Sequence, residues 1–144
     1  MKNLFINKGN YPADEKTISR LILFLKEKFD KKIESLEVNF ISPAEIKKLN
    51  RSFLKHDYVT DILTFSYSED TSTIDAEMII CYDEAVKNAS KFNAGVEEEV
   101  IRLVIHGFLH LIGFDDAHPN DRKVMSNTEN ELIKTFKFSL LKQN

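Results

Sequence analysis

The stretch IRLVIHGFLHLIGFDDAH, residues 101–118, determines how the rest of this sequence is interpreted. Its first thirteen residues are apolar or glycine with three exceptions, namely Arg102, His106 and His110. Such a run predicts a helix that is buried on nearly all sides. Three of the four histidines lie in this stretch, and burying imidazoles in so apolar a segment is costly unless something binds them.

The spacing of the two inner histidines suits a metal ion. His106 and His110 are four residues apart, which places both imidazoles on one helix face, one turn apart. Gly113 follows where a helix commonly ends in a left-handed residue, so the next loop can present a further ligand. Asp116 and His118 are both candidates for that ligand. Two hydrogen-bonded core histidines are the alternative, but the whole constellation favours a metal site.

The same spacing resembles the zinc metalloprotease arrangement H-E-x-x-H-x-x-G-x-x-H/D, with one large difference. Those enzymes carry a general-base glutamate directly after the first histidine, whereas this chain has Gly107. A general base would therefore have to come from elsewhere in the chain. The candidates, in order of preference, are Asp115, Asp57, His56 and Asp61.

The composition indicates one ordinary folded domain spanning residues 1–144. A chain of 144 residues is long enough to bury about 70% of the surface that its unfolded form exposes. Cys81 is the only cysteine, so a metal would be held by histidine and carboxylate rather than by thiolates. No apolar run reaches the length of a membrane span and no signal peptide opens the chain, so we expect a soluble, cytoplasmic protein without a membrane partner.

The net charge of -3 gives no general argument for binding nucleic acid, and we expect no DNA partner. One segment is nevertheless locally basic, because it carries Lys47, Lys48, Arg51 and Lys55. A solvated helix face is the plain interpretation of this cluster, and an RNA-binding face is the functional one.

The periodicity of apolar residues predicts an alternation of strands and helices that begins β-α-β-α. The Met78–Cys81 segment indicates a strand buried on both faces, and therefore a central one. Asp14, Ser42 and Asp83 are the expected N-caps. The expected strands cover residues 3–8, 36–41, 61–67 and 74–82, and the expected helices run to about Phe29, Phe53, Phe92, Gly113 and Phe136.

Three stretches of the chain resemble a known family. His106-Gly-Phe-Leu-His110-Leu-Ile-Gly113-Phe-Asp115, with Met125 twelve residues after the glycine, is similar to the H-G-x-L-H-L-x-G-Y-D-H motif of the YbeY-type endoribonucleases, which are bacterial ribosomal RNA maturation factors. Upstream, residues 49–65 resemble that family's L-N-x-x-Y-R…D…T-D-V-L-S-F segment. Residues 77–81 look like its G-D-I-x-I-C strand.

The chain departs from the family pattern at three places. Asp116 stands where the family has its third histidine, and Leu54 stands where it has an arginine. Ala76-Glu77 replaces Gly-Asp before the central strand. A carboxylate oxygen is an acceptable zinc ligand, so the resemblance implies His106, His110 and Asp116 as ligands, with His118 as the substitute.

The resemblance implies an α+β fold, with a mixed sheet of about four strands, flanking helices and a buried metal-binding helix. It also implies a metal-dependent, single-strand-selective endoribonuclease that acts in maturation of small-subunit ribosomal RNA and in ribosome quality control. One zinc ion is the expected cofactor, although nickel, cobalt or iron would fit the same ligands. Single-stranded RNA, ribosomal RNA or the small ribosomal subunit is the expected partner, bound mainly by the basic cluster.

Two other functions stay open at this point. The first is a non-catalytic ribosome-assembly factor in which the metal only holds the long helix to the following loop, an alternative that Leu54 motivates. The second is a metallopeptidase with related ligand spacing, which the missing glutamate at Gly107 argues against.

Overall fold

The polypeptide alternates between strands and helices, as the apolar periodicity predicts. The structure is a computed structural model that describes residues 3–142. Its elements, in chain order, are β1 Leu4–Asn7, α1 Glu15–Lys28, β2 Lys32–Ile41, α2 Pro43–Leu49, the π-helix η1 Asn50–Leu54, β3 Ile62–Ser66, β4 Thr73–Cys81, α3 Tyr82–Lys91, α4 Val96–Leu111 and α5 Pro119–Lys142.

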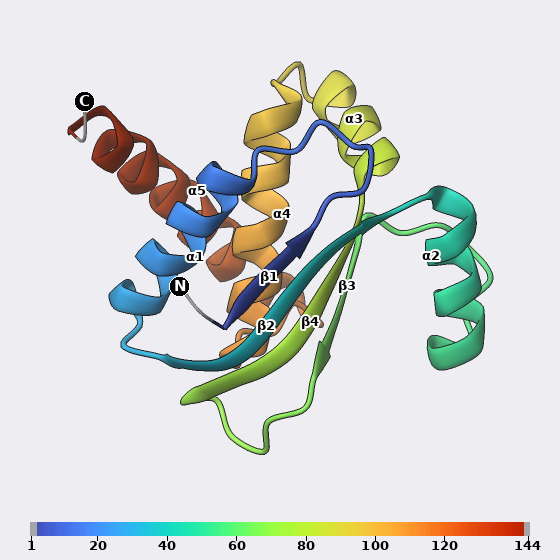
Figure 1. The fold of residues 1–144 in the computed structure, drawn as a ribbon, viewed down its shortest axis with the longest axis horizontal. Coiled ribbons are helices and arrows are strands. Elements are labelled where there is room, and N and C mark those ends of the chain that lie inside the picture. The colour runs from blue at the N-terminus through green and yellow to red at the C-terminus, as the bar shows by residue number, and fades with distance from the viewer. Residues whose placement is uncertain (1–2, 143–144) are drawn as a thin grey trace.

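The four strands form one mixed sheet in the order β1-β2-β4-β3 (Figure 1). The first three of these are mutually parallel, whereas β3 pairs antiparallel with β4 at one edge of the sheet. Strand β4 is an inner strand, and its residues Met78 to Cys81 are all buried. The expected mixed sheet of four strands and the inner position of this segment are both confirmed.

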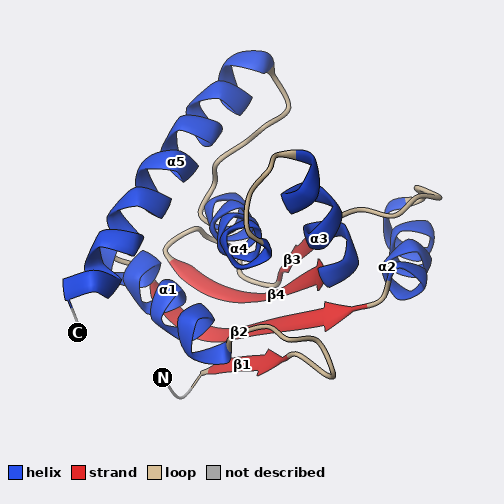
Figure 2. Ribbon diagram, turned by 90° about the horizontal axis from the view of Figure 1, so that it is seen from above, coloured by secondary structure: helices blue, strands red, loops and turns tan. Residues whose placement is uncertain are grey.

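Helix α4 packs against the sheet and is surrounded by α1, α3 and α5 (Figure 2). Ten of its sixteen residues are buried, which confirms the expected burial on nearly all sides. Arg102, His106 and His110 are only half-buried, and their spacing of four residues aligns them in one stripe. Beyond the first turn of α4, where Glu97 is exposed, this stripe is the part of the helix that is most open to the surface.

Gly107 explains how α4 can approach the sheet so closely. A Cβ atom at this position would lie 3.0 Å from Cδ1 of Ile62, 3.2 Å from Cγ2 of Thr64 and 3.3 Å from Sδ of Met78. The helix therefore contacts β3 and β4 at the residue that lies between the two histidines. Any side chain at this position would press on these three neighbours.

The helix ends confirm two expected caps and correct a third. The Asp14 carboxylate accepts hydrogen bonds from the backbone N–H groups of Lys16 and Thr17, and Ser42 forms a reciprocal capping box with Glu45. The expected cap at Asp83 is wrong, because α3 already begins at Tyr82 and Cys81 occupies the cap position without a side-chain bond.

Several element bounds also differ from the expectation. Strand β2 begins four residues earlier than expected, because Lys32–Ser35 extends its pairing with β4. The α-helix expected up to Phe53 ends at Leu49, and a π-helical turn follows it. Helix α5 continues beyond Phe136 to Lys142. Among residues 3–142, no helix combines the length and the apolar character needed to cross a membrane.

Candidate metal centre and catalytic cleft

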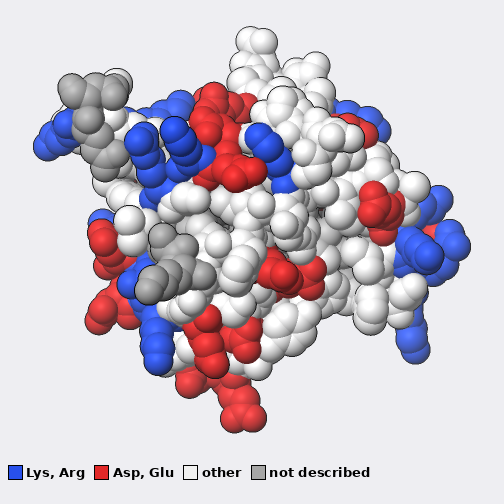
Figure 3. Space-filling view, viewed as in Figure 1, with Lys and Arg blue, Asp and Glu red and all other residues white. Residues whose placement is uncertain are grey.

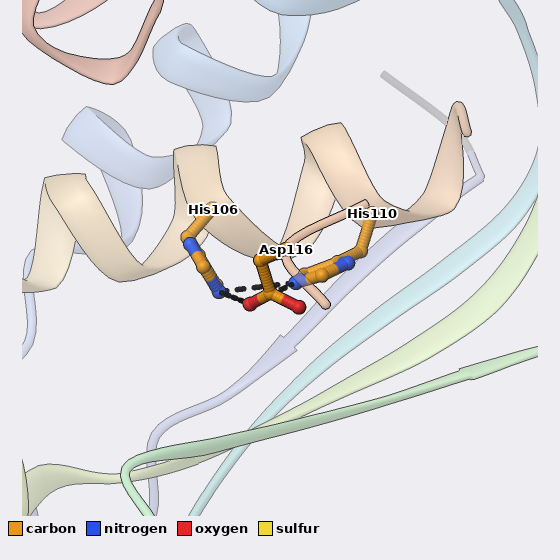
Figure 4. Close-up of side chains that lie close together, drawn as sticks. All are labelled: His106, His110 and Asp116. Carbon is orange, nitrogen blue, oxygen red and sulfur yellow. Dashed lines mark hydrogen bonds and ion pairs between the residues drawn. The ribbon is translucent and has the colours of Figure 1, made fainter. Parts of the chain in front are cut away.

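His106 and His110 point their imidazoles toward one another from the open stripe of α4 (Figure 4). Their Nε2 atoms are 3.1 Å apart and their ring centroids 4.6 Å apart. Two nitrogen atoms this close need a proton or a cation between them, because their lone pairs would otherwise repel. The pair is therefore arranged to share one positively charged species.

The turn after α4 brings Asp116 to the same point. Gly113 has a φ of +107°, and the N–H groups of Gly113 and Phe114 bond to the carbonyls of His110 and Leu109, which is a Schellman motif. The chain then doubles back toward the helix. Asp116 Oδ2 lies 3.2 Å from His110 Nε2 and 3.6 Å from His106 Nε2.

The spacing of these three ligand atoms fits a zinc ion. Ligand atoms about 2.0–2.1 Å from a tetrahedral zinc are about 3.3 Å from one another. The three distances of 3.1, 3.2 and 3.6 Å lie close to that value. Two imidazole nitrogens and one carboxylate oxygen are also a ligand set that zinc accepts, and such a set leaves a fourth position open.

Glu129 on α5 favours the tautomer of His106 that a metal ligand needs, with the proton on Nδ1. Its Oε2 atom is 2.6 Å from His106 Nδ1, and its Oε1 atom accepts a hydrogen bond of 3.2 Å from the Arg102 guanidinium. A proton on Nδ1 leaves the Nε2 lone pair free to face the metal position. Burial opposes protonation of His106, but Glu129, with Asp116 and Asp61 nearby, outweighs it and raises the pKa of this imidazole.

Glu129 was not among the site residues predicted from the sequence. A signal was present, since Met125, Leu132 and Phe136 define the buried face of α5 and position 129 falls on that face. A carboxylate in a core position needs a partner on a neighbouring element. The sequence could not show which element that would be.

His118 and Asp115 lie apart from the three ligand atoms. His118 is exposed, and the group of candidate ligands in residues 3–142 consists of His106, His110 and Asp116 without it. Asp115 is also exposed, and its carboxylate accepts the N–H of Ala117 within the loop. The geometry therefore favours Asp116 over His118 as third ligand, and it leaves Asp115 outside the site.

A cleft of about 390 Å³ opens in front of the histidines and is lined by Asp61, Gly107 and Leu54 among others. Of the four catalytic candidates, only Asp61 lines it. Asp57 instead forms a 2.7 Å ion pair with Arg51, and this pair lowers the pKa of the Asp57 carboxyl. His56 is exposed, with its ring 5.3 Å from that of Tyr58.

A family model described as Endoribonuclease YbeY matches residues 7–137. The chain belongs to this family. It is therefore a hydrolytic enzyme of the endoribonuclease class. The YbeY model spans β2, β3, β4, the histidine-bearing helix α4 and most of α5, so the candidate site described above lies within the matched region.

Individual relatives agree with the family assignment. Proteins named Endoribonuclease YbeY are 37% identical over 83% of both chains in Parabacteroides distasonis, and 41% identical over 72% of both chains in Chlorobium phaeobacteroides. The solution structure of TM1509 from Thermotoga maritima superposes with a TM-score of 0.69 at 26% identity, covering 97% of this chain and 93% of that one.

The basic cluster lies on α2 and η1, at the far side of the YbeY fold from α5. Blue side chains gather over α2 at the right-hand edge of Figure 3. Lys48, Arg51 and Lys55 are exposed and Lys47 is half-buried. Arg51 is paired with Asp57, whereas the three lysines of the cluster form no ion pair within residues 3–142. Leu54, on the same π-helix, joins this basic surface to the cleft.

Proposed function

We propose that this chain is a metal-dependent, single-strand-selective endoribonuclease that acts in the cytoplasm, in maturation of small-subunit ribosomal RNA and in ribosome quality control. One zinc ion would be held by His106 Nε2, His110 Nε2 and Asp116 Oδ2. The observation that carries the proposal is the triangle of these three atoms, with the His106 ring fixed by Glu129, in a member of an endoribonuclease family.

A bound zinc ion would act as a Lewis acid toward a phosphoryl oxygen and would acidify a water molecule. Hydrolysis joins the oxygen of a water to phosphorus and breaks the bond to the leaving ribose oxygen. The water must lose a proton and the leaving ribose oxygen must gain one, and Asp61, the carboxylate of the cleft outside the ligand set, would carry the proton from one to the other. Asn88 donates a 3.1 Å hydrogen bond to Asp61 Oδ2 and so orients this group.

RNA would enter across the lysine-bearing surface of α2 and η1. Lys47, Lys48 and Lys55 would neutralise phosphates on one side of the cleft, and Leu54 would contact the strand without a charge. Arginine contacts phosphate bidentately, so an apolar residue at position 54 makes the lysines more important for holding the RNA.

The experiment that tests the proposal combines metal content with cleavage. Purified wild-type protein should contain about one ion per chain and should cut single-stranded RNA, and both properties should be lost in His106→Ala and in Asp116→Ala. His118→Ala is the matched control and should retain both. Normal metal content in Asp116→Ala would refute the assigned ligand set.

The same samples separate the two rival functions. A purely structural metal predicts that chelation unfolds the protein, which circular dichroism would show, and that the folded holoprotein leaves RNA intact. A metallopeptidase predicts turnover of a peptide library instead. Gly107 argues against the latter, because it stands where such enzymes carry their general-base glutamate, at the close contact of α4 with β3.

A further inference from the structure

The cleft adjoins, past His106, a second hollow whose residues Phe92 and Glu99 have no role in the reaction described above. This hollow, of about 730 Å³, lies between α3, α4 and α5, and α3 and α5 flank α4 there (Figure 2). Asp61 and His106 line both the hollow and the cleft. A nucleotide next to the reacting phosphate would therefore reach it.

The charge of the hollow does not suit a phosphate. Four carboxylate residues line it, namely Asp61, Glu98, Glu99 and Glu129, against two cations, Lys91 and Arg102. Three of the carboxylates are engaged: Glu98 pairs with Lys137, Glu129 with Arg102 and His106, and Asp61 accepts from Asn88. An excess of carboxylates repels phosphate and attracts a group that donates hydrogen bonds.

Glu99 is the carboxylate left with an open acceptor. Its residue surface is only 8% exposed, yet it lines the hollow. Within residues 3–142, its one hydrogen bond is a long one of 3.4 Å, from Asn88 Nδ2 to Oε2. A buried carboxylate with so little compensation is costly, which is why burial raises its pKa. A ligand that donates two hydrogen bonds would remove that cost.

Phe92 supplies an apolar surface at the same hollow. It follows the last turn of α3, its side chain is 68% exposed, and its ring lies 5.8 Å from Lys91 Nζ. Exposed aromatic rings beside single-stranded RNA commonly stack with bases that are turned out of the strand. The hollow therefore combines a stacking surface with an acceptor for a base edge.

We propose that this hollow binds a guanine base of the RNA next to the scissile phosphate, with Phe92 stacked on the ring and Glu99 accepting from its Watson–Crick edge. Guanine has two adjacent donors on that edge, N1–H and the N2 amino group, which match the two oxygens of a carboxylate. Adenine and cytosine each place an acceptor beside their one amino group there, and uracil places carbonyls on both sides of its one N–H. The carboxylate would repel those acceptors.

The inference rests on the proposed nuclease function, but binding tests it without cleavage. Wild-type protein would be titrated by NMR with GMP, AMP, CMP and UMP. GMP should bind about tenfold more tightly than the other three, since a bidentate side-chain pair discriminates by that order. Equal affinity for all four nucleotides would overturn the proposal.

Variants at Glu99 and Phe92 test what each residue contributes to nucleotide binding, and a variant at Glu97 is the control. Glu99→Gln replaces one acceptor with a donor, so the preference for GMP should fall to less than about threefold. Glu97→Gln removes the same charge from the same helical turn at an exposed residue outside the hollow and should keep the wild-type preference. Phe92→Ala, at an exposed position, should weaken all four nucleotides by about tenfold. Guanine selectivity that persists in Glu99→Gln would contradict the assignment.

Cleavage of a random single-stranded RNA gives the second readout. Wild type should cut next to guanine, and Glu99→Gln should cut without that preference. RNA cut at all bases alike by wild type would overturn the inference and leave the nuclease function standing. Selective binding of GMP by a protein that never cuts RNA would support base binding in the hollow and would refute the nuclease function. A second bound ion per chain that is lost in Glu99→Gln would make the hollow a cation site and would refute base binding.

Discussion

The imidazole of His106 has a partner at each of its two nitrogens, and these partners set how the ring can bind a metal ion. Nδ1 faces Glu129 and Nε2 faces His110 and Asp116. The sequence identified one side of this arrangement, because His106, His110 and the acid at position 116 all lie in one stretch of eleven residues. Glu129 comes from another helix, and only the packing of α5 on α4 places it there.

Glu129→Gln should therefore weaken metal binding without abolishing it. The amide can still accept from Nδ1, but it carries no charge, so we expect a loss of about tenfold in zinc affinity, at the lower end for groups that orient a ligand. Competition with a fluorescent chelator would measure this loss. Glu131→Gln, an exposed change on the same helix, is the control, and an equal loss in both variants would contradict a specific role for Glu129.

At the scale of elements, the contact of α4 with β3 and β4 is set by one glycine. Gly107→Ala would gain about 1 kcal/mol of helix propensity. The added methyl group would, however, press on Ile62, Thr64 and Met78 at 3.0–3.3 Å, and overpacking costs about 1–3 kcal/mol. We expect a net loss of stability on the order of 1 kcal/mol, measured by urea unfolding. A variant more stable than wild type would show that the neighbouring side chains of the sheet can accommodate the methyl group without a loss of stability.

The start of α1 depends on a titratable cap. The Thr17 hydroxyl, together with the N–H groups of Thr17 and Lys16, bonds to the Asp14 carboxylate and lowers its pKa below 3.8. Because the pKa is lower in the folded protein, the cap stabilises it above the unfolded pKa, and this contribution is lost as the pH falls through the folded pKa.

Asp14→Ala should therefore cost about 1 kcal/mol at pH 7. The difference from wild type should shrink below pH 4, as chemical unfolding at a series of pH values would show. Asp14→Asn keeps a capping oxygen without the charge and should lose less stability at neutral pH. A difference between wild type and Asp14→Ala that does not change with pH would mean that the carboxylate charge contributes nothing.

At the scale of the whole molecule, basic side chains gather over α2, at the right-hand edge of Figure 3, whereas carboxylates line the hollow beside α4. This distribution is invisible in a net charge of -3. We expect this distribution to orient a single RNA strand, because phosphates would be attracted to the lysines and repelled by the carboxylates. The polarity arises from the tertiary structure, since Asp61 and Glu99 are far apart in the sequence.

RNA affinity should consequently fall steeply with salt, and the slope should depend on the lysines. Each phosphate contact contributes about 0.7 to the slope of log K against log salt for a single strand. Replacing Lys47, Lys48 and Lys55 with alanine should reduce the slope by about 2. The control changes Lys16, Lys28 and Lys134, which lie on α1 and α5. Equal slopes for both triple variants would remove the α2 surface from RNA binding.

The sequence by itself predicted most of the elements and the pair of histidines, because both depend on local spacing, and it left Asp116 and His118 as alternative third ligands. Apolar periodicity predicted the β-α-β-α start and the buried helix, and a helix pitch of 3.6 residues brings His106 and His110 together wherever that helix lies. Local spacing also misled, since the acid at position 83 resembled a helix cap although the helix begins one residue earlier.

Only the tertiary structure decided which more distant groups share the site. It placed Glu129 against His106, Asp61 in the cleft and Glu99 in the hollow, and it left Asp57, His56 and Asp115 outside. The physical reason is that contacts between different elements depend on how their faces pack, and one sequence records which face is apolar but not which neighbour covers it.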